Sequence, residues 1–270
     1  MGASFEPITS LKHPAVQHAR SLQTPAGRAE TRQFLIEGEG MLHQALAANA
    51  GLTDAFFLDA AVTDASLSSA LDAARVNRYT LGRGLMTKIL GTGYDTSITA
   101  VGVVPMRVAG LDDVARLAGP LLACERIQDP RNVGVLLRTA EAGGARAVLL
   151  SDDSADPFSR AAVRSTTGSI LRLPLVLSAD FAADLARLRD AGRRLIASSA
   201  RATTLVWDAG LDARGVIIVG NESEGISSQV RELADEVVAI PVAGGASSFN
   251  VTVAAGILLY ECARRERESR

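Results

Sequence analysis

The chain has 270 residues and a formal net charge of −2, and 47% of its residues are hydrophobic while 21% are charged. This composition is close to the globular average and excludes a chain that is disordered throughout. The charge gives no global indication of a nucleic-acid partner, although a local basic patch would suffice for one. Residues 1–10 lack a basic head and an apolar stretch, and no apolar run nears the ~20 residues of a membrane span, so we expect a globular, cytoplasmic protein with no membrane partner.

Residues 1–104 mix short helical and strand-like patterns, and we expect them to form a smaller N-terminal α/β domain. Residues 105–119 are expected to be a linker that contains a short helix at 112–117. The elements predicted in the N-terminal part are strands at Gln33–Glu37, 55–58 and 98–104 and a helix at 40–50.

Residues 120–270 alternate between strand-like runs and helical patterns, which predicts an α/β domain built on a parallel sheet. One helix is expected from Asn132 to the glycine pair at 143–144. Another is expected to begin at Asp156-Pro157, with the aspartate as its cap and the proline in its first turn. The remaining predicted elements are strands at 120–127, 145–150, 171–177, 194–198, 215–220 and 236–241, a helix at 181–191 capped by Asp180, and a last helix from Asn250.

Three polar loops follow predicted strands and precede predicted helices: QDPRNVG at 128–134, GNESEG at 220–225 and AGGASSFN at 243–250. In an open parallel sheet, ligands bind beyond the carboxyl ends of the strands, where such loops meet. Their glycines allow the backbone to approach a ligand closely. We therefore expect the functional site to be built from these loops.

Other chemical signatures are missing from the sequence. No Ser–His–Asp, HExxH, P-loop or GxGxxG pattern occurs, and the two cysteines exclude a disulfide framework and a four-cysteine zinc site. His13, His18 and His43 have no acidic partner at a useful spacing, and we interpret them as surface residues. No metal is expected.

Taken singly, the polar residues of the three loops have ordinary structural explanations. Asn132 fits a helix cap, Arg138 fits a solvated position on a helix, and the glycines at 220–225 fit a plain turn. Ser248 and Asn250 fit the N-terminal cap of the last helix.

Taken together and in order, three segments resemble the signature motifs of the SpoU/TrmH family of RNA ribose 2′-O-methyltransferases, in the SPOUT superfamily. The segments are NVGVLLRTA at 132–140, VGNESEG at 219–225 and IPVAGGASSFNVTVAAG at 240–256. The resemblance covers residues 120–265, and its one departure is Phe249, where the family usually has leucine. It implies that residues 120–270 form a parallel-sheet domain with a deep trefoil knot, which periodicity alone does not indicate.

The resemblance also implies a cofactor, S-adenosylmethionine, held by the knot loops largely through backbone groups. The residues that match the cofactor-contacting positions are Gly220, Ile240 and Phe249. The residues that match the catalytic positions are Asn132, Arg138, Glu222, Ser248 and Asn250.

The chemistry of the family requires a ribose 2′-hydroxyl to lose its proton and to lie in line with the methyl–sulfur bond. Positioning alone can supply ~7–11 kcal/mol of such a barrier. A guanidinium has a pKa above ~12 and rarely loses its proton, so our hypothesis is that Arg138 grips the neighbouring RNA phosphate and stabilises the developing alkoxide. Glu222 and Asn132 would hold the loops and orient Arg138, while Ser248 and Asn250 would fix the third loop or the target nucleotide.

The N-terminal part adds to the resemblance. The segments ITSLKHPAVQHARSL at 8–22 and TRQFLIEGEGMLHQAL at 31–46 resemble the substrate-binding domain of the family, which is similar to a small ribosomal RNA-binding protein. A generic accessory domain is the alternative interpretation. The family works as homodimers, so the resemblance implies a homodimer here, although burial of Val253 and Ile257 against the chain's own sheet would equally explain the apolar last helix.

The basic residues of the chain are almost all arginines. Only Lys12 and Lys88 are lysines, so 26 of the 28 basic residues are arginines, which codon usage explains but which also suits bidentate phosphate contacts. Arg160 and Arg164 are four residues apart on a predicted helix and share a face. They either contact RNA phosphates or form a solvated face.

The sequence favours an enzyme that transfers a methyl group from S-adenosylmethionine to a ribose 2′-hydroxyl in RNA. We expect 23S ribosomal RNA as the substrate, because ribosomal members of the family often carry the additional N-terminal domain. A transfer-RNA 2′-O-methyltransferase is the alternative within the class, and a non-catalytic RNA-binding protein of the same fold is the alternative outside it. A nucleotide-dependent oxidoreductase is disfavoured by the missing glycine fingerprint.

Overall fold

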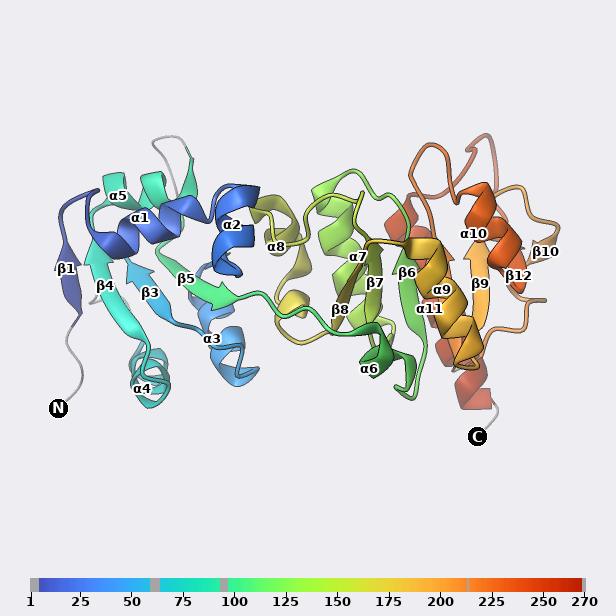
Figure 1. The fold of residues 1–270 in the computed structure, drawn as a ribbon, viewed down its shortest axis with the longest axis horizontal. Helices are drawn as coiled ribbons and strands as arrows, with labels where there is room; N and C mark the ends of the chain where they lie inside the picture. The colour runs from blue at the N-terminus through green and yellow to red at the C-terminus, as the bar shows by residue number, and fades with distance from the viewer. Residues whose placement is uncertain (1–4, 59–63, 93–96, 213, 269–270) are drawn as a thin grey trace. The chain divides into compact units, whose positions relative to one another are not determined.

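The computed structural model describes residues 5–58, 64–92, 97–212 and 214–268, which divide into two compact units (Figure 1). Unit 1 consists of Met1–Met106 and Phe158–Arg172, and unit 2 consists of Arg107–Pro157 and Leu173–Arg270. Residues 1–4, part of the N-terminus in which no leader is expected, lie outside the described ranges. No helix within those ranges has the length and apolar character needed to cross a membrane.

Unit 1 contains a five-stranded mixed sheet in the order β1-β4-β3-β5-β2, in which β5 runs antiparallel to both β3 and β2. Its strands are β1 (Glu6–Ile8), β2 (Gln33–Glu37), β3 (Asp54–Phe57), β4 (Asn77–Leu81) and β5 (Ala100–Pro105). Its helices are α1 (Pro14–Ser21), α2 (Pro25–Thr31), α3 (Glu39–Ala47), α4 (Ala65–Ala73), α5 (Arg83–Leu90), α8 (Arg160–Thr166) and the short 3-10 helix η2 (Ser169–Leu171). The strands and the helix predicted in this part are confirmed, with ends that shift by a few residues.

Helices cover both faces of the unit 1 sheet. α1 and α5 pack against each other and against one face, around a core that includes Val16, Phe56 and Met86. α3 and α4 lie side by side on the opposite face (Figure 1).

Two histidines of this unit do have acidic partners, contrary to expectation. His13 contacts Glu6 at 3.2 Å and His43 contacts Asp64 at 3.3 Å. The two residues of each pair are 7 and 21 positions apart in the sequence, and the fold brings them together.

The segment Phe158–Arg172 clusters with unit 1, although the sequence placed it inside the C-terminal domain. The ring of Phe158 packs on that of Phe34 in β2, with 5.1 Å between their centroids.

The expected helix start at Asp156-Pro157 is wrong. The helix begins at Arg160 because the Ser159 hydroxyl accepts the backbone N–H of Ala162 and provides the N-cap.

Unit 2 contains a seven-stranded sheet in the order β10-β12-β9-β11-β6-β7-β8, and all of its pairings are parallel. Its strands are β6 (Leu121–Cys124), β7 (Val148–Ser151), β8 (Leu175–Ser178), β9 (Arg194–Ser198), β10 (Thr204–Leu205), β11 (Gly215–Val219) and β12 (Glu236–Ala239). Its helices are α6 (Leu111–Ala115), α7 (Pro130–Ala142), α9 (Phe181–Asp190), α10 (Ser228–Leu233) and α11 (Val251–Glu268). The parallel sheet predicted from the strand–helix alternation is confirmed.

The last helix, α11, packs closely against α7 and β11. A Cβ atom on Gly143 would lie 2.8 Å from the Cβ of Leu259, so the end of α7 tolerates no side chain there. Leu258 and Leu259 are fully buried, whereas Val253 and Tyr260 remain 47% and 73% exposed. Because β6, β9, β11 and β12 run in one direction, the loops that follow them meet at one edge of the sheet.

Candidate active site

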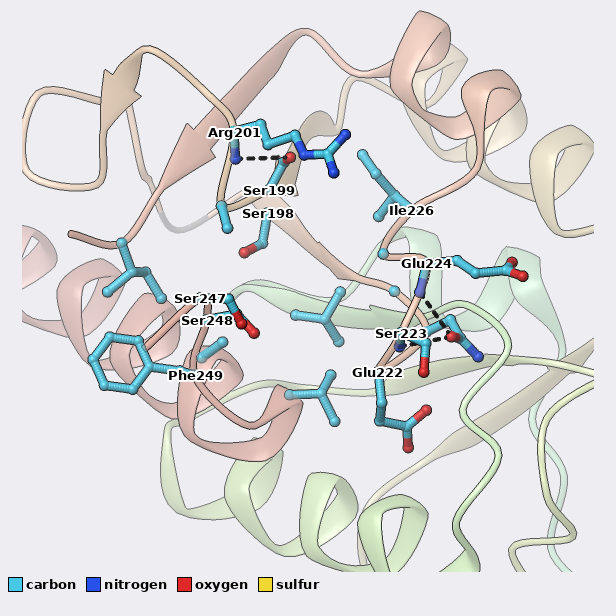
Figure 2. A pocket seen from close by; sticks show the side chains of 18 of the residues that line it. Ser198, Ser199, Arg201, Glu222, Ser223, Glu224, Ile226, Ser247, Ser248 and Phe249 are labelled. Atoms are coloured by element: carbon cyan, nitrogen blue, oxygen red, sulfur yellow. Dashed lines mark hydrogen bonds between the residues drawn. The ribbon is translucent and has the colours of Figure 1, made fainter. Parts of the chain in front are cut away.

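A cavity of about 520 Å³ opens at the carboxyl ends of β9, β11 and β12 (Figure 2). This volume lies within the range of small-molecule and cofactor sites. The second and third of the three predicted loops contribute to its lining, which includes the three residues predicted to contact a cofactor, Gly220, Ile240 and Phe249. The lining comes from residues around 198–201, 219–226, 240–242 and 247–254, together with Arg231.

Glu222 joins the first predicted loop to the second. Its Oε1 accepts a hydrogen bond from Nδ2 of Asn132 at 2.8 Å, and its Oε2 accepts one from the backbone N–H of Gln128 at 3.4 Å. Asn132 is therefore not the cap of α7. Asp129 has that role, since its Oδ1 accepts the backbone N–H of Arg131 at 2.8 Å and Pro130 follows as the first helical residue.

The second loop is a closed turn organised by Asn221. Its Oδ1 accepts the backbone N–H groups of Ser223 and Glu224 at 2.9 and 3.0 Å, and its carbonyl accepts the N–H of Gly225 at 2.9 Å. A Cβ atom on Gly220 would lie 2.3 Å from the carbonyl carbon of Gly225. Only glycine at position 220 therefore permits this turn.

Arg126 ties the end of β6 to the far side of the second loop. Its Nη1 donates to Oε2 of Glu224 at 2.5 Å, and its Nη2 donates to the carbonyl of Gly225 at 3.4 Å. The Arg126 carbonyl in turn accepts Nδ2 of Asn221 at 2.9 Å. Glu224 thus has a cationic partner, whereas the partners of Glu222 are neutral amides.

The third loop supplies the cavity wall that lies before α11. Ser247, Ser248 and Phe249 line the cavity (Figure 2), and the side chain of Phe249 is 40% exposed. Asn250 does not line it. Its Oδ1 accepts the backbone N–H and the hydroxyl of Thr252 at 2.9 and 2.7 Å, so the interpretation of Asn250 as a helix cap is confirmed.

A fourth loop, at residues 198–202, also lines the cavity and was not predicted. It follows β9, and its Ser199 hydroxyl accepts Nη2 of Arg231 in α10 at 3.0 Å and the backbone N–H of Arg201 at 3.4 Å. Arg201 and Arg231 add two cations to the cavity lining, and Figure 2 shows Arg201 on the side away from Glu222. The polar run SSARAT at 198–203 could have predicted this loop, because it comes at the end of a predicted strand of the same sheet.

Arg138 lies outside the cavity lining of its own chain. It is exposed on α7 and forms no hydrogen bond or ion pair with the described residues. It comes six residues after Asn132, which is about 9 Å further along the helix axis. The structure therefore brings Asn132, Glu222 and Ser248 to the cavity and its rim but leaves Arg138 on the outer surface.

Arg160 and Arg164 lie on α8, in unit 1, and share a face as expected. Both guanidinium groups contact Glu37 in β2, whose side chain is only 6% exposed. Nη2 of Arg160 donates to Oε2 of Glu37 at 3.1 Å, Nε of Arg160 donates to Oε1, and Nη1 of Arg164 donates to Oε2 at 3.4 Å. Their charge therefore compensates a buried carboxylate.

The chemistry open to the cavity is that of binding and positioning. No histidine or lysine lines it, so the described lining offers no neutral base for a serine nucleophile. Burial raises the pKa of the nearby Cys124 thiol, which therefore stays protonated. No group of three or more histidine, cysteine, aspartate or glutamate side chains that could hold a metal is found among the residues described.

Two family models match the chain. The model described as SpoU rRNA Methylase family matches residues 120–260, and the model described as Thiostrepton-resistance methylase, N terminus, matches residues 5–117.

Similar proteins extend over nearly the whole chain. An uncharacterized tRNA/rRNA methyltransferase of Synechocystis is 33% identical over 260 residues, covering 96% of this chain and 94% of that protein. The 23S rRNA (guanosine(2553)-2′-O)-methyltransferase RlmP of Bacillus subtilis is 28% identical and covers 94% of this chain and 97% of its own. The crystal structure of an AdoMet-bound rRNA methyltransferase from Sinorhizobium meliloti superposes with a TM-score of 0.86 at 26% identity, over 97% of this chain and 98% of that one.

Proposed function

The chain belongs to the SpoU rRNA methylase family and is an S-adenosylmethionine-dependent RNA 2′-O-methyltransferase, and we propose that its substrate is a ribose of 23S ribosomal RNA. The observation that carries the proposal is the meeting of the motif loops at one cavity, with Asn132 bonded to Glu222 at its rim. The likeness to the Bacillus subtilis 23S rRNA enzyme supports the choice of RNA. A ribosomal RNA substrate places the reaction in the cytoplasm.

The cavity fits the cofactor in size and in chemistry. Its second loop presents backbone groups, and Val219, Ile226 and Ile240 offer apolar surface to an adenine ring. When bound, S-adenosylmethionine supplies an electrophilic methyl group on a sulfonium centre. We assign Gly220, Ile240 and Phe249 to hold it, largely through backbone groups and apolar contact.

The chain's own residues have separate tasks in this proposal. Arg138 binds the phosphate beside the target ribose and stabilises the negative charge that develops on the 2′-oxygen as its proton leaves. The guanidinium remains protonated throughout. Glu222 and Asn132 hold the first two loops together, Ser248 faces the target nucleotide, and Asn250 fixes the third loop through its bonds to Thr252.

The proposal includes a homodimer formed through the outer face of α11. Val253 and Tyr260 are seven residues apart, so they lie on one side of the helix, and both are exposed. Contact between these side chains of two copies would remove apolar surface from water. Arg138 is exposed on α7, the helix that packs beside α11, so we assign it to the cavity of the partner copy.

Two finer features of the fold belong to the proposal as well. The residues that follow the linker, 120–270, are proposed to contain a deep trefoil knot. The return of α11 to pack on α7 and β11, near the middle of the sheet, supports this proposal.

The N-terminal domain, residues 1–104, is proposed to bind the RNA. Its match to the N-terminal model of thiostrepton-resistance methylases supports this proposal.

The test is to delete the gene and map ribose methylation across ribosomal and transfer RNA. We expect loss of one methylated ribose in 23S RNA, restored by the wild-type chain and not by Arg138→Ala. Loss of a methylated ribose in a transfer RNA instead would show that transfer RNA is the substrate of the same reaction. Failure of the purified chain to move a labelled methyl group to any of these RNAs would leave only an RNA-binding role.

A further inference from the structure

The cavity lining carries positive charge to which the proposed function assigns no task. Among the described residues of the lining, the cations are Arg201, in the loop after β9, and Arg231, in α10. Both residues are exposed, and neither forms an ion pair with a described residue. Two cations that line one cavity without an acidic partner repel each other, and an anion bound beside them would relieve this repulsion.

A single hydroxyl group brings the two arginines together. The Ser199 hydroxyl accepts a hydrogen bond from Nη2 of Arg231 at 3.0 Å, and it also accepts the backbone N–H of Arg201 at 3.4 Å (Figure 2). The backbone N–H of Ser199 donates to the carbonyl of Val238 in β12 at 2.9 Å, which fixes the loop to the sheet. The guanidinium of Arg201 forms no hydrogen bond with a described residue, so all of its donors are available to a ligand.

The helix that carries Arg231 is also held in place. The Ser227 hydroxyl caps α10 by accepting the backbone N–H of Val230 at 3.2 Å. The backbone N–H of Ser227 donates to Oε2 of Glu125 at 2.8 Å, and Glu125 is buried directly after β6. Because this contact sets the start of α10, less conformational entropy is lost when Arg231 binds a ligand.

The other side of the cavity carries the opposite charge. Glu222 lies away from Arg201 (Figure 2), and its hydrogen-bond partners are neutral amides that leave its negative charge uncompensated. Glu224 also lines the cavity, but its charge is balanced by Arg126. An anionic group in the cavity is therefore repelled by Glu222 and attracted by the two arginines.

We propose that Arg201 and Arg231, together with the Ser199 hydroxyl, form a subsite for the α-carboxylate of S-adenosylmethionine. The inference rests on the proposed function, because it takes this cofactor to occupy the cavity. The carboxylate is the one anionic group of the cofactor, since the adenine and ribose are neutral and the sulfonium and amino groups are positive. A guanidinium matches a carboxylate through two parallel hydrogen bonds. The subsite holds the methionyl end away from Glu222, so the charges of the cavity orient the cofactor.

The test compares two compounds that differ in the carboxylate alone. Decarboxylated S-adenosylmethionine keeps the adenosine, the sulfonium and the amino group. In calorimetric titrations of the full-length protein, we expect it to bind at least about tenfold more weakly than S-adenosylmethionine, because it leaves the two arginines without an anion. Equal affinities for the two compounds would overturn the proposal.

A substitution then assigns the difference to the arginines. Arg201→Gln removes a cation without breaking a side-chain hydrogen bond among the described residues. It should weaken the binding of S-adenosylmethionine about tenfold and should not weaken the binding of the decarboxylated compound. Arg116→Gln is the matched control, because Arg116 is an exposed arginine after α6 that does not line the cavity. It should bind both compounds as the wild type does, and the circular dichroism of all three proteins should agree.

The same variant excludes two other roles for Arg201. Equal weakening of both compounds would show that the arginine shapes the cavity without binding the carboxylate. Weaker binding of a 23S RNA transcript, with unchanged affinity for S-adenosylmethionine, would show that it contacts an RNA phosphate. Either result would overturn the proposal. We expect the affinity of Arg201→Gln for the transcript to stay within about twofold of the wild type.

The outcomes also separate this inference from the proposed function. A wild-type chain that prefers S-adenosylmethionine to the decarboxylated compound, but transfers no methyl group to RNA, would remove the proposed function and keep the subsite. Methyl transfer to 23S RNA with equal affinities for the two compounds would remove the subsite and keep the function.

Discussion

Arg138 is the side chain on which the proposed mechanism makes its most specific demand. It is exposed on α7 and forms no described ion pair, so its fork of donors is available to a phosphate. A lysine at this position would keep the charge and lose the planar, two-pronged geometry. A lysine substitution therefore separates the contribution of the bidentate contact of Arg138 from that of its positive charge.

We expect Arg138→Lys to lower kcat by about tenfold or more, which corresponds to ~1.4 kcal/mol of transition-state stabilisation. The affinity for S-adenosylmethionine should stay unchanged, because the proposal assigns Arg138 to the RNA phosphate and the 2′-oxygen and not to the cofactor. Single-turnover methyl transfer to saturating RNA measures the first quantity and calorimetry the second. Turnover close to that of the wild type would count against a bidentate phosphate contact.

Gly220 is a second residue whose role follows from geometry. A side chain there would meet the backbone of Gly225 and Ile226, which cannot yield as the end of a flexible side chain can. Gly220→Ala should open the second loop and weaken the binding of S-adenosylmethionine by about tenfold or more, as a calorimetric titration would show. Gly245→Ala, in the third loop where an added Cβ meets nothing within 4 Å, is the matched control and should bind normally. Equal affinities for the two variants would show that the turn is not required.

At the scale of elements, the end of α11 is held by a small ionic cluster. Glu261 accepts Nη2 of Arg264 at 2.7 Å and Nε of Arg265 at 2.8 Å, and Nη1 and Nη2 of Arg265 also donate to the carbonyls of Ala209 and Trp207. The hydrogen bond from Arg264, followed by that from Arg265, lowers the pKa of Glu261 from 4.5 to about 2. The cluster therefore links the last helix to the chain that leads into β11.

A carboxylate whose pKa is lowered by folding stabilises the folded state above its ordinary pKa and loses that contribution as the pH falls to its folded value. We expect Glu261→Gln to lower the thermal midpoint of unfolding at pH 7, with the difference from the wild type shrinking between pH 4.5 and about 2. Glu232→Gln, at an exposed position of α10 with no described ion pair, should leave the midpoint unchanged. A difference that stays constant over this pH range would contradict the assignment.

The sequence predicted these elements well where periodicity and caps agree. The carboxyl-end rule for parallel strands was enough to bring the second and third loops to one cavity, because it needs only the direction of the strands. It would also have found residues 198–202, but this loop has no glycine to draw attention to it. Asn132 was ambiguous, because its partner Glu222 is 90 positions away in sequence and only the fold joins them.

Other features were beyond the reach of sequence patterns. The apolar residues of 158–172 indicate that this segment is buried, but they do not indicate which of the two cores it packs against. The sequence of the segment alone therefore does not assign it to unit 1. Their attachment depends on the ring contact of Phe158 with Phe34 and on the ion pairs of Arg160 and Arg164 with Glu37. Each of these contacts joins positions more than a hundred residues apart, as the spacing of 123 between Arg160 and Glu37 shows.

At the scale of the whole molecule, the proposed homodimer gives the exposed position of Arg138 a role. Its own cavity lacks it, while it lies on the helix beside the exposed row of Val253 and Tyr260. If the copies pair through this row, each cavity receives its arginine from the partner. The arrangement can be distinguished from a monomeric site by mixing two chains of low activity.

One chain carries Arg138→Ala with an intact cavity, and the other carries Gly220→Ala with an intact Arg138. At a concentration of S-adenosylmethionine well below the Kd of the Gly220→Ala chain, each should have little activity as a homodimer. In a mixed dimer, the intact cavity of the first chain receives Arg138 from the second, so about one working site per dimer is expected, and co-purified, differently tagged chains should recover up to half of the wild-type turnover. If Arg138 served its own chain, the first chain would lack the arginine and the second the cavity, and mixing would restore nothing. Val253→Glu, introduced into both chains, should place a charge in the apolar row, separate the copies on size-exclusion chromatography and abolish the recovery.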